Sequence, residues 1–91
     1  MNVSEFFSPE NTAHLITEQD KRIHLENAMQ YTWLERQADI TEIEFSLRSQ
    51  WFRDVFLKSD HAPELLDAFK ASPETVIDTL EREYTNSVRR H

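Results

Sequence analysis

The chain of 91 residues contains no glycine, although average usage of about 7% would supply about six. Glycine adopts the positive φ angles of hairpin turns and tight loops at almost no steric cost. A chain without it avoids most of those geometries, and the fold class that needs them least is all-α. The same absence excludes the glycine-rich motifs that bind nucleotide phosphates.

Length and composition predict one domain over residues 1–91, with residues 1–8 as a flexible acidic N-terminal arm. The lack of cysteine excludes disulfides and thiolate metal sites. The N-terminus has neither the basic nor the apolar region of a secretory signal peptide. No stretch reaches the ~20 apolar residues of a membrane span. We therefore expect a cytoplasmic protein that does not enter a membrane.

Capping residues and prolines divide the chain into helical segments. Residues 43–47 alternate like a strand, but no second strand pattern exists to pair with them, so helix is favoured. The cap candidates are Ser8 before Pro9, Thr17 before two acids, Thr41 at capping-box spacing from Glu44, and Ser72 before Pro73. They predict helices over 9–15, 18–37, 42–58, 62–71 and 73–89. The two long helices 18–37 and 42–58 are expected to form an antiparallel pair in a small bundle.

The C-terminal segment is amphipathic, with one apolar stripe and one charged face. The stripe is formed by Val76, Ile77, Leu80, Tyr84 and Val88, and the opposite face by Glu74, Asp78, Glu81 and Arg82.

Segments 18–37 and 42–58 each carry two apolar stripes instead of one. In the first segment Ile23, Tyr31 and Leu34 form one stripe, and Leu25, Met29 and Trp33 the other. In the second they are Ile43, Leu47, Trp51 and Val55, and Phe45, Phe52 and Phe56.

A helix that is apolar on two sides is either enclosed in a bundle or shared with a second chain. Coverage by Phe6, Phe7, Leu15 and Ile16 of the N-terminal segment is one explanation, and a partner surface is the one we favour. The residues expected to bind a partner are Leu25, Met29, Trp33, Phe45, Trp51, Phe52 and Phe56. Replacing Phe52 and Phe56 by alanine should then abolish association and leave helicity nearly intact.

No constellation of catalytic or metal-ligating residues stands out. His14 with Glu18, and Asp60 and His61 near Glu64, offer too few ligands for a zinc site and are interpreted as solvated surface groups. There is no nucleophile elbow, and neighbouring carboxylates such as Glu42 and Glu44 point to different sides of a helix. We expect no enzymatic activity, no cofactor and no small-molecule substrate.

Residues Leu66–Leu80 loosely resemble the helix-turn-helix of bacterial DNA-binding proteins, which implies a small transcriptional regulator. Lys70-Ala71 replaces the usual turn glycine, and Glu74, Asp78 and Glu81 occupy positions that would face DNA. Direct nucleic-acid binding is therefore not expected. The residues that carry the resemblance are Leu65, Leu66, Phe69, Ser72, Pro73, Thr75, Val76 and Leu80.

The net charge of −7 suggests a further alternative. Carboxylates along a helix can imitate DNA phosphates, and an acidic surface of Glu74, Asp78 and Glu81 would suit a phage-type inhibitor of a basic protein. The interpretation that we favour is a non-enzymatic interaction module, an adaptor or inhibitor that acts through aromatic-rich helix faces and forms a homodimer.

Overall fold

The computed structural model describes residue 13 and residues 17–89, and in this part of the chain the fold is all-α, as predicted. The predicted helix 9–15 and arm 1–8 lie outside the described residues, except for Ala13. The elements are the helices α3 (Glu18–Glu35) and α4 (Glu42–Trp51), a π-helical turn η1 (Phe52–Phe56), and the helices α5 (Ala62–Phe69) and α6 (Pro73–Arg89).

Two of the predicted caps are confirmed by side-chain hydrogen bonds. The hydroxyl of Thr17 accepts from the backbone N–H of Asp20 at 3.0 Å, and the Asp20 carboxylate accepts from the N–H of Thr17 at 3.4 Å. The hydroxyl of Thr41 accepts from the N–H of Glu44 at 3.1 Å. Each bond satisfies a backbone donor that has no partner within its own helix.

The predicted ends of three helices were wrong. α3 ends at Glu35 and α5 at Phe69, two residues earlier than expected in each case. The predicted helix 42–58 is not continuous, because α4 ends at Trp51 and η1 follows it. The N–H of Leu57 donates to the carbonyl of Phe52 at 2.9 Å, the i→i+5 bond of a π-turn.

The connection between α3 and α4 contains the one residue of the described chain with positive φ, Asp39 at 56°. Aspartate tolerates this left-handed conformation better than most residues with a side chain. Asp39 thus takes the place that glycine has in many other loops.

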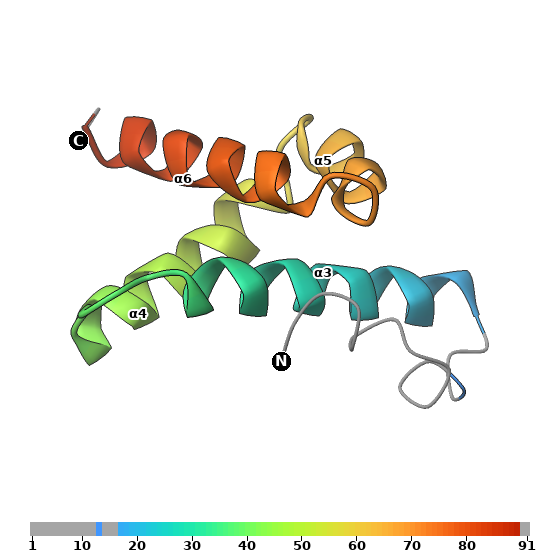
Figure 1. Ribbon diagram of the computed structural model, residues 1–91, viewed down its shortest axis with the longest axis horizontal. Coiled ribbons are helices and arrows are strands. Elements are labelled where there is room, and N and C mark those ends of the chain that lie inside the picture. Colours follow the sequence, from blue (N-terminus) through green and yellow to red (C-terminus); the bar gives the residue numbers. More distant parts are fainter. Residues whose placement is uncertain (1–12, 14–16, 90–91) are drawn as a thin grey trace.

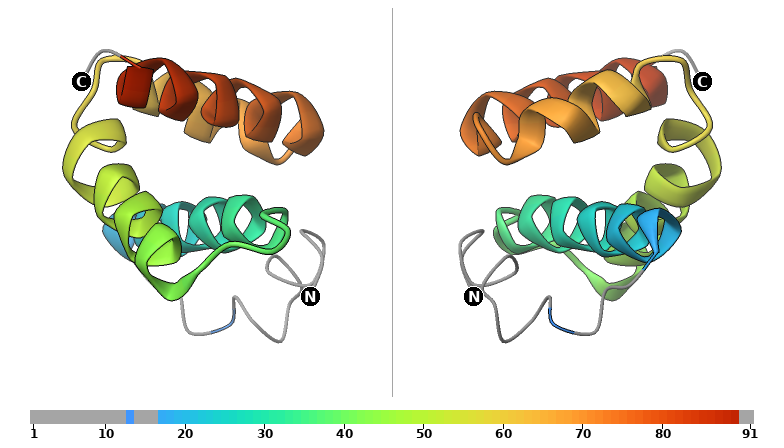
Figure 2. Two further views of the ribbon diagram at one scale, coloured as in Figure 1. Left: turned by 90° about the vertical axis from the view of Figure 1, so that its left-hand side faces the viewer. Right: turned by 90° about the vertical axis from the view of Figure 1, so that its right-hand side faces the viewer.

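The helices form two layers (Figures 1 and 2). α3 and α4 lie in one layer, where α4 turns back from the end of α3, and α5 and α6 lie in the other. η1 and the residues after it lead from the first layer to the second. α3 contacts α4, α5 and α6, so it is the central element of the fold.

The core lies between the layers and is rich in aromatic rings. Trp33 of α3 is at its centre, with its ring centroid 5.6 Å from Trp51, 6.3 Å from Phe52 and 5.5 Å from Tyr84. The other large side chains of the core are all buried: Met29, Phe56, Leu66, Phe69, Val76, Ile77 and Leu80.

Candidate functional site

Most of the predicted partner-binding residues belong to the core. Met29, Trp33, Phe52 and Phe56 have no exposed surface, so the prediction that these side chains lie on a free helix face was wrong. Leu25 and Trp51 are half-buried and pack against the same core, and Phe45 is exposed.

These side chains are buried because α5 and α6 cover the aromatic stripes, and the sequence pattern does not indicate this cover. Trp33 and Trp51 both contact Tyr84 of α6, edge to face, at 5.5 and 5.2 Å between centroids. Such pairs stabilise a core beyond the area that they bury. One chain can therefore enclose the rings by itself.

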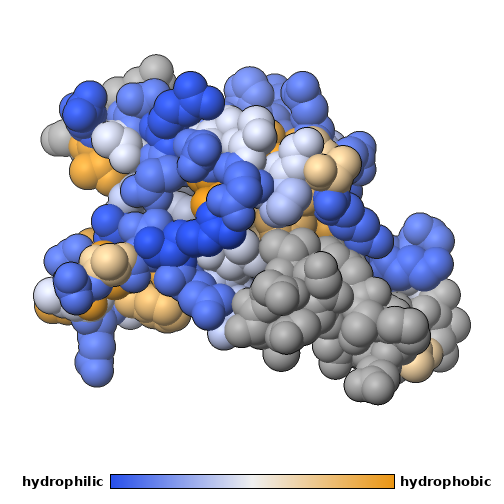
Figure 3. Space-filling model, viewed as in Figure 1, coloured by the Kyte–Doolittle hydropathy of each residue, from blue (hydrophilic) through white to orange (hydrophobic). Residues whose placement is uncertain are grey.

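Aliphatic side chains on the other stripe of α4 and η1 are exposed instead. Ile43 is 73% exposed, Leu47 53% and Val55 51%, and the half-buried Trp51 lies between them in sequence. We call Ile43, Leu47 and Val55 the aliphatic stripe. Figure 3 shows apolar surface over the start of α4 and near the C-terminal end of α6, where Val88 is also exposed. The sequence revealed this stripe but not that it faces solvent.

Two donors beside the aliphatic stripe have no acceptor. The indole N–H of Trp51 and the Nε of Arg48 are buried and lack a hydrogen-bond partner among the described residues. The Arg48 guanidinium lies over the Tyr84 ring, 4.9 Å from its centroid, and its Nη1 donates to the Glu44 carbonyl at 3.3 Å. This cation–π contact links α4 to the last helix.

The predicted acidic surface of α6 is largely engaged within the chain. Both carboxylate oxygens of Glu74 accept from the Arg36 guanidinium, which holds the pKa of Glu74 below its ordinary value and raises that of Arg36. One oxygen of Glu81 accepts from the Trp33 indole at 2.6 Å and from the Gln37 amide at 2.8 Å. Asp78 is exposed, and within the described part of the chain no such bond holds its carboxylate.

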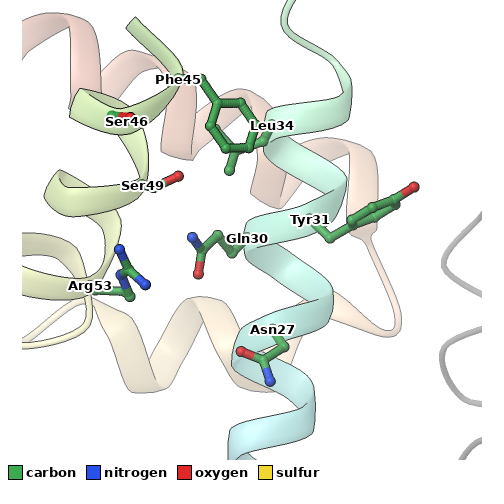
Figure 4. A pocket seen from close by; sticks show the side chains of 8 residues that line it. All are labelled: Asn27, Gln30, Tyr31, Leu34, Phe45, Ser46, Ser49 and Arg53. Atoms are coloured by element: carbon green, nitrogen blue, oxygen red, sulfur yellow. The ribbon is translucent and has the colours of Figure 1, made fainter. Parts of the chain in front are cut away.

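A groove runs between α3 and the α4–η1 segment (Figure 4). It has a volume of about 460 Å³. Gln30 of α3 and Arg53 of η1 point into it from opposite sides, and the Ser49 hydroxyl points into it from α4. Leu34 and Phe45 form an apolar end. No sequence pattern indicates this groove, because it depends on how two helices approach each other.

The described residues contain no cluster of three or more His, Cys, Asp or Glu side chains that could bind a metal ion. Within the same part of the chain, no helix combines the length and the apolar character that a bilayer span requires.

α5 and α6 contact each other, as the two helices of a helix-turn-helix do. The exposed side of α6 carries Glu74 and Asp78, however, where DNA would require basic residues to contact phosphates.

Comparison with known proteins gives no relative: no family model matches the chain, and neither a curated protein nor a solved structure is significantly similar to it.

Proposed function

We propose that this protein is a non-enzymatic protein–protein interaction module that self-associates through the aliphatic stripe of α4 and η1. The observation that carries the proposal is the exposure of Ile43, Leu47 and Val55 in a chain that buries its core aromatics completely. Isolated apolar residues on a surface are ordinary, whereas a row of them along one helix is typical of an interaction surface.

The spacing of the stripe suits a second copy of the same helix. Ile43 and Leu47 are four residues apart, so they lie on one side of α4, and Val55 extends the row into η1. Two copies related by a twofold axis perpendicular to the helix would bring the same stripe together in antiparallel orientation. Each copy then offers aliphatic side chains to aliphatic side chains.

Charge along the helix favours the antiparallel arrangement. α4 begins with Glu42 and Glu44, and Lys58 follows η1. A parallel pair would place Glu42 and Glu44 of the two copies together. An antiparallel pair instead places them near the other end, where Arg53 and Lys58 balance Asp54 and Asp60.

The size of the stripe predicts a dimer that dissociates readily. Stable interfaces bury about 800 Å² on each partner, and three aliphatic side chains provide less than this. We therefore expect monomer and dimer to exchange at micromolar to millimolar concentration.

The inhibitor that imitates DNA remains an alternative with less support. The charge of Glu74 is paired with that of Arg36, and Glu81 is half-buried against Trp33, so the surface presents less free negative charge than the sequence suggested. A regulator that binds DNA through α6 also has less support, because the exposed face of α6 is acidic and would repel the phosphates.

Sedimentation velocity over about 10 µM to 1 mM tests the proposal. The wild-type protein should shift from monomer to dimer, and Leu47→Asp should remain monomeric because a buried carboxylate without a partner opposes association. Ile23→Asp is the matched control, since it places the same charge at an exposed apolar position of α3. A wild-type protein that stays monomeric at the highest concentration, or an Ile23→Asp variant that dissociates equally, would contradict the proposal.

A further inference from the structure

The groove between α3 and α4 lies on a different side of α4 from the aliphatic stripe. At 100° per residue, Phe45, Ser46 and Ser49, which line the groove, are centred about 135° around the helix from Ile43 and Leu47. Association through the stripe thus leaves the groove open, and the two surfaces can be tested separately.

Ser49 is the most unusual residue of the groove. Its side chain is only 7% exposed, and its hydroxyl has no hydrogen-bond partner among the residues that the structure describes. A serine within a helix commonly donates to the carbonyl four residues earlier, but here that bond is absent from the described chain. The hydroxyl instead points into the groove, as Figure 4 shows. A buried polar group without a partner is destabilising, which suggests that a bound molecule supplies the missing partner.

The charge of the groove is opposite to that of the chain. Arg53 extends its guanidinium into the space and forms no ion pair within the described part of the chain. The described residues that line the groove include no carboxylate, although the chain has a net charge of −7. Gln30 and Asn27 add amide groups on the opposite wall, which is formed by α3, so N–H donors lie on both sides of the space.

Leu34 and Phe45 give the groove an apolar end next to these donors (Figure 4). Phe45 is 48% exposed, so an incoming apolar side chain can cover the part that now contacts water. The lining therefore fits a ligand with a negative group and an apolar group side by side.

We propose that the groove binds an acidic peptide segment of a partner protein, in which a carboxylate contacts Arg53 and Ser49 and a neighbouring apolar side chain contacts Phe45. A single guanidinium among neutral donors suits the single charge of a carboxylate. The proposal does not depend on self-association.

An NMR titration of the ¹⁵N-labelled protein tests this inference with acetyl-Leu-Glu-Phe-amide as the probe. The amide resonances of residues 45–53 should shift in a saturable manner, and the matched acetyl-Leu-Gln-Phe-amide should bind about tenfold more weakly because it lacks the charge. Equal binding of the two peptides would overturn the proposal. Equal shifts with sodium acetate alone would also overturn it, by assigning the groove to small carboxylates.

Two variants connect the binding to named residues. Arg53→Gln should weaken binding of the glutamate peptide by about tenfold, whereas Arg82→Gln, which removes the same charge from α6, should leave it unchanged. Equal effects of the two would show that net charge alone attracts the peptide, which would overturn the site.

Ser49→Ala provides the sharpest test, because it should change stability and binding in opposite directions. Removal of an unpartnered buried hydroxyl should raise the Tm of the free protein, and it should weaken peptide binding several-fold. A higher Tm with unchanged binding would show that the hydroxyl does not contact the ligand. Leu47→Asp, which should prevent self-association, should bind the peptide normally. The proposed dimer and the proposed peptide site can therefore fail independently of each other.

Discussion

At the scale of single residues, Glu81 shows how the fold changes the meaning of a charged side chain. The sequence places Glu81 on the charged face of the last helix, and a helical wheel predicts a solvated acid there. In the structure it is half-buried and accepts from the Trp33 indole, 48 residues away in sequence. No local pattern can reveal a hydrogen bond of this kind, because it depends on how α6 lies over α3.

We expect Glu81→Ala to destabilise the protein by about 1–3 kcal/mol, because it leaves the buried indole N–H of Trp33 without an acceptor. Chemical denaturation followed by circular dichroism would measure the loss. Asp78→Ala removes an exposed acid from the same helix and should change stability by less than about 0.5 kcal/mol. Equal effects of the two substitutions would mean that the Trp33–Glu81 bond contributes nothing.

At the scale of helices, the starts were easier to predict than the ends. Thr17, Thr41 and Pro73 mark the starts of α3, α4 and α6, and all three are visible in the sequence because caps and prolines act locally. The end of α4 at Trp51 has no such mark. Neither glycine nor proline follows it. A π-turn replaces the α-helix there, and Phe52 and Phe56 of this turn lie in the core with their ring centroids 5.2 Å apart. The change from α-helix to π-turn thus coincides with tertiary packing, which cannot be read from the sequence pattern.

The ion pair between Arg36 and Glu74 joins two helix ends. Arg36 is the C-cap of α3 and Glu74 lies in the first turn of α6, so each charge also opposes the helix dipole at its own end. Since the pKa of Glu74 is lowered on folding, the pair adds stability above the ordinary glutamate pKa. This contribution is lost as the pH falls through the lowered pKa of the folded state.

We predict that Arg36→Gln raises the pKa of Glu74 toward its ordinary value of 4.5, because the hydrogen bond that stabilises the carboxylate is gone. Titration of the ¹³C side-chain carboxyl resonance would measure it. Arg82→Gln removes an equal charge elsewhere on α6 and should leave that pKa nearly unchanged. High salt should shrink the shift in the wild-type protein, since both side chains are exposed to solvent.

At the scale of the whole molecule, the fold class was predictable and the division between core and surface was not. The absence of glycine and the helical periodicity were enough for an all-α chain. Of the two apolar stripes on α4, the aromatic one is largely enclosed and the aliphatic one faces water. Both stripes have the same periodicity, so only the placement of α5 and α6 decides between them.

The double variant Phe52→Ala with Phe56→Ala should now unfold the protein, contrary to the expectation from sequence that it would remain helical. Each fully buried Phe→Ala change costs about 3–5 kcal/mol, and a small domain has about 5–15 kcal/mol in total. Thermal melting followed by circular dichroism should show loss of the cooperative transition. Ile43→Ala with Val55→Ala truncates two exposed side chains and should retain it; a cooperative melt in the phenylalanine variant would place those rings outside the core.

The arrangement of Trp33 and Trp51 gives the protein an intrinsic optical signal. Two indoles with centroids 5.6 Å apart couple their electronic transitions, and Tyr84 is close enough to both to transfer its excitation energy to them. The two indoles come from different helices of one layer, and Tyr84 comes from the other layer. Separation of the layers would therefore move Tyr84 away from both indoles. Near-ultraviolet spectra of the unlabelled chain can thus report on the joining of the two layers.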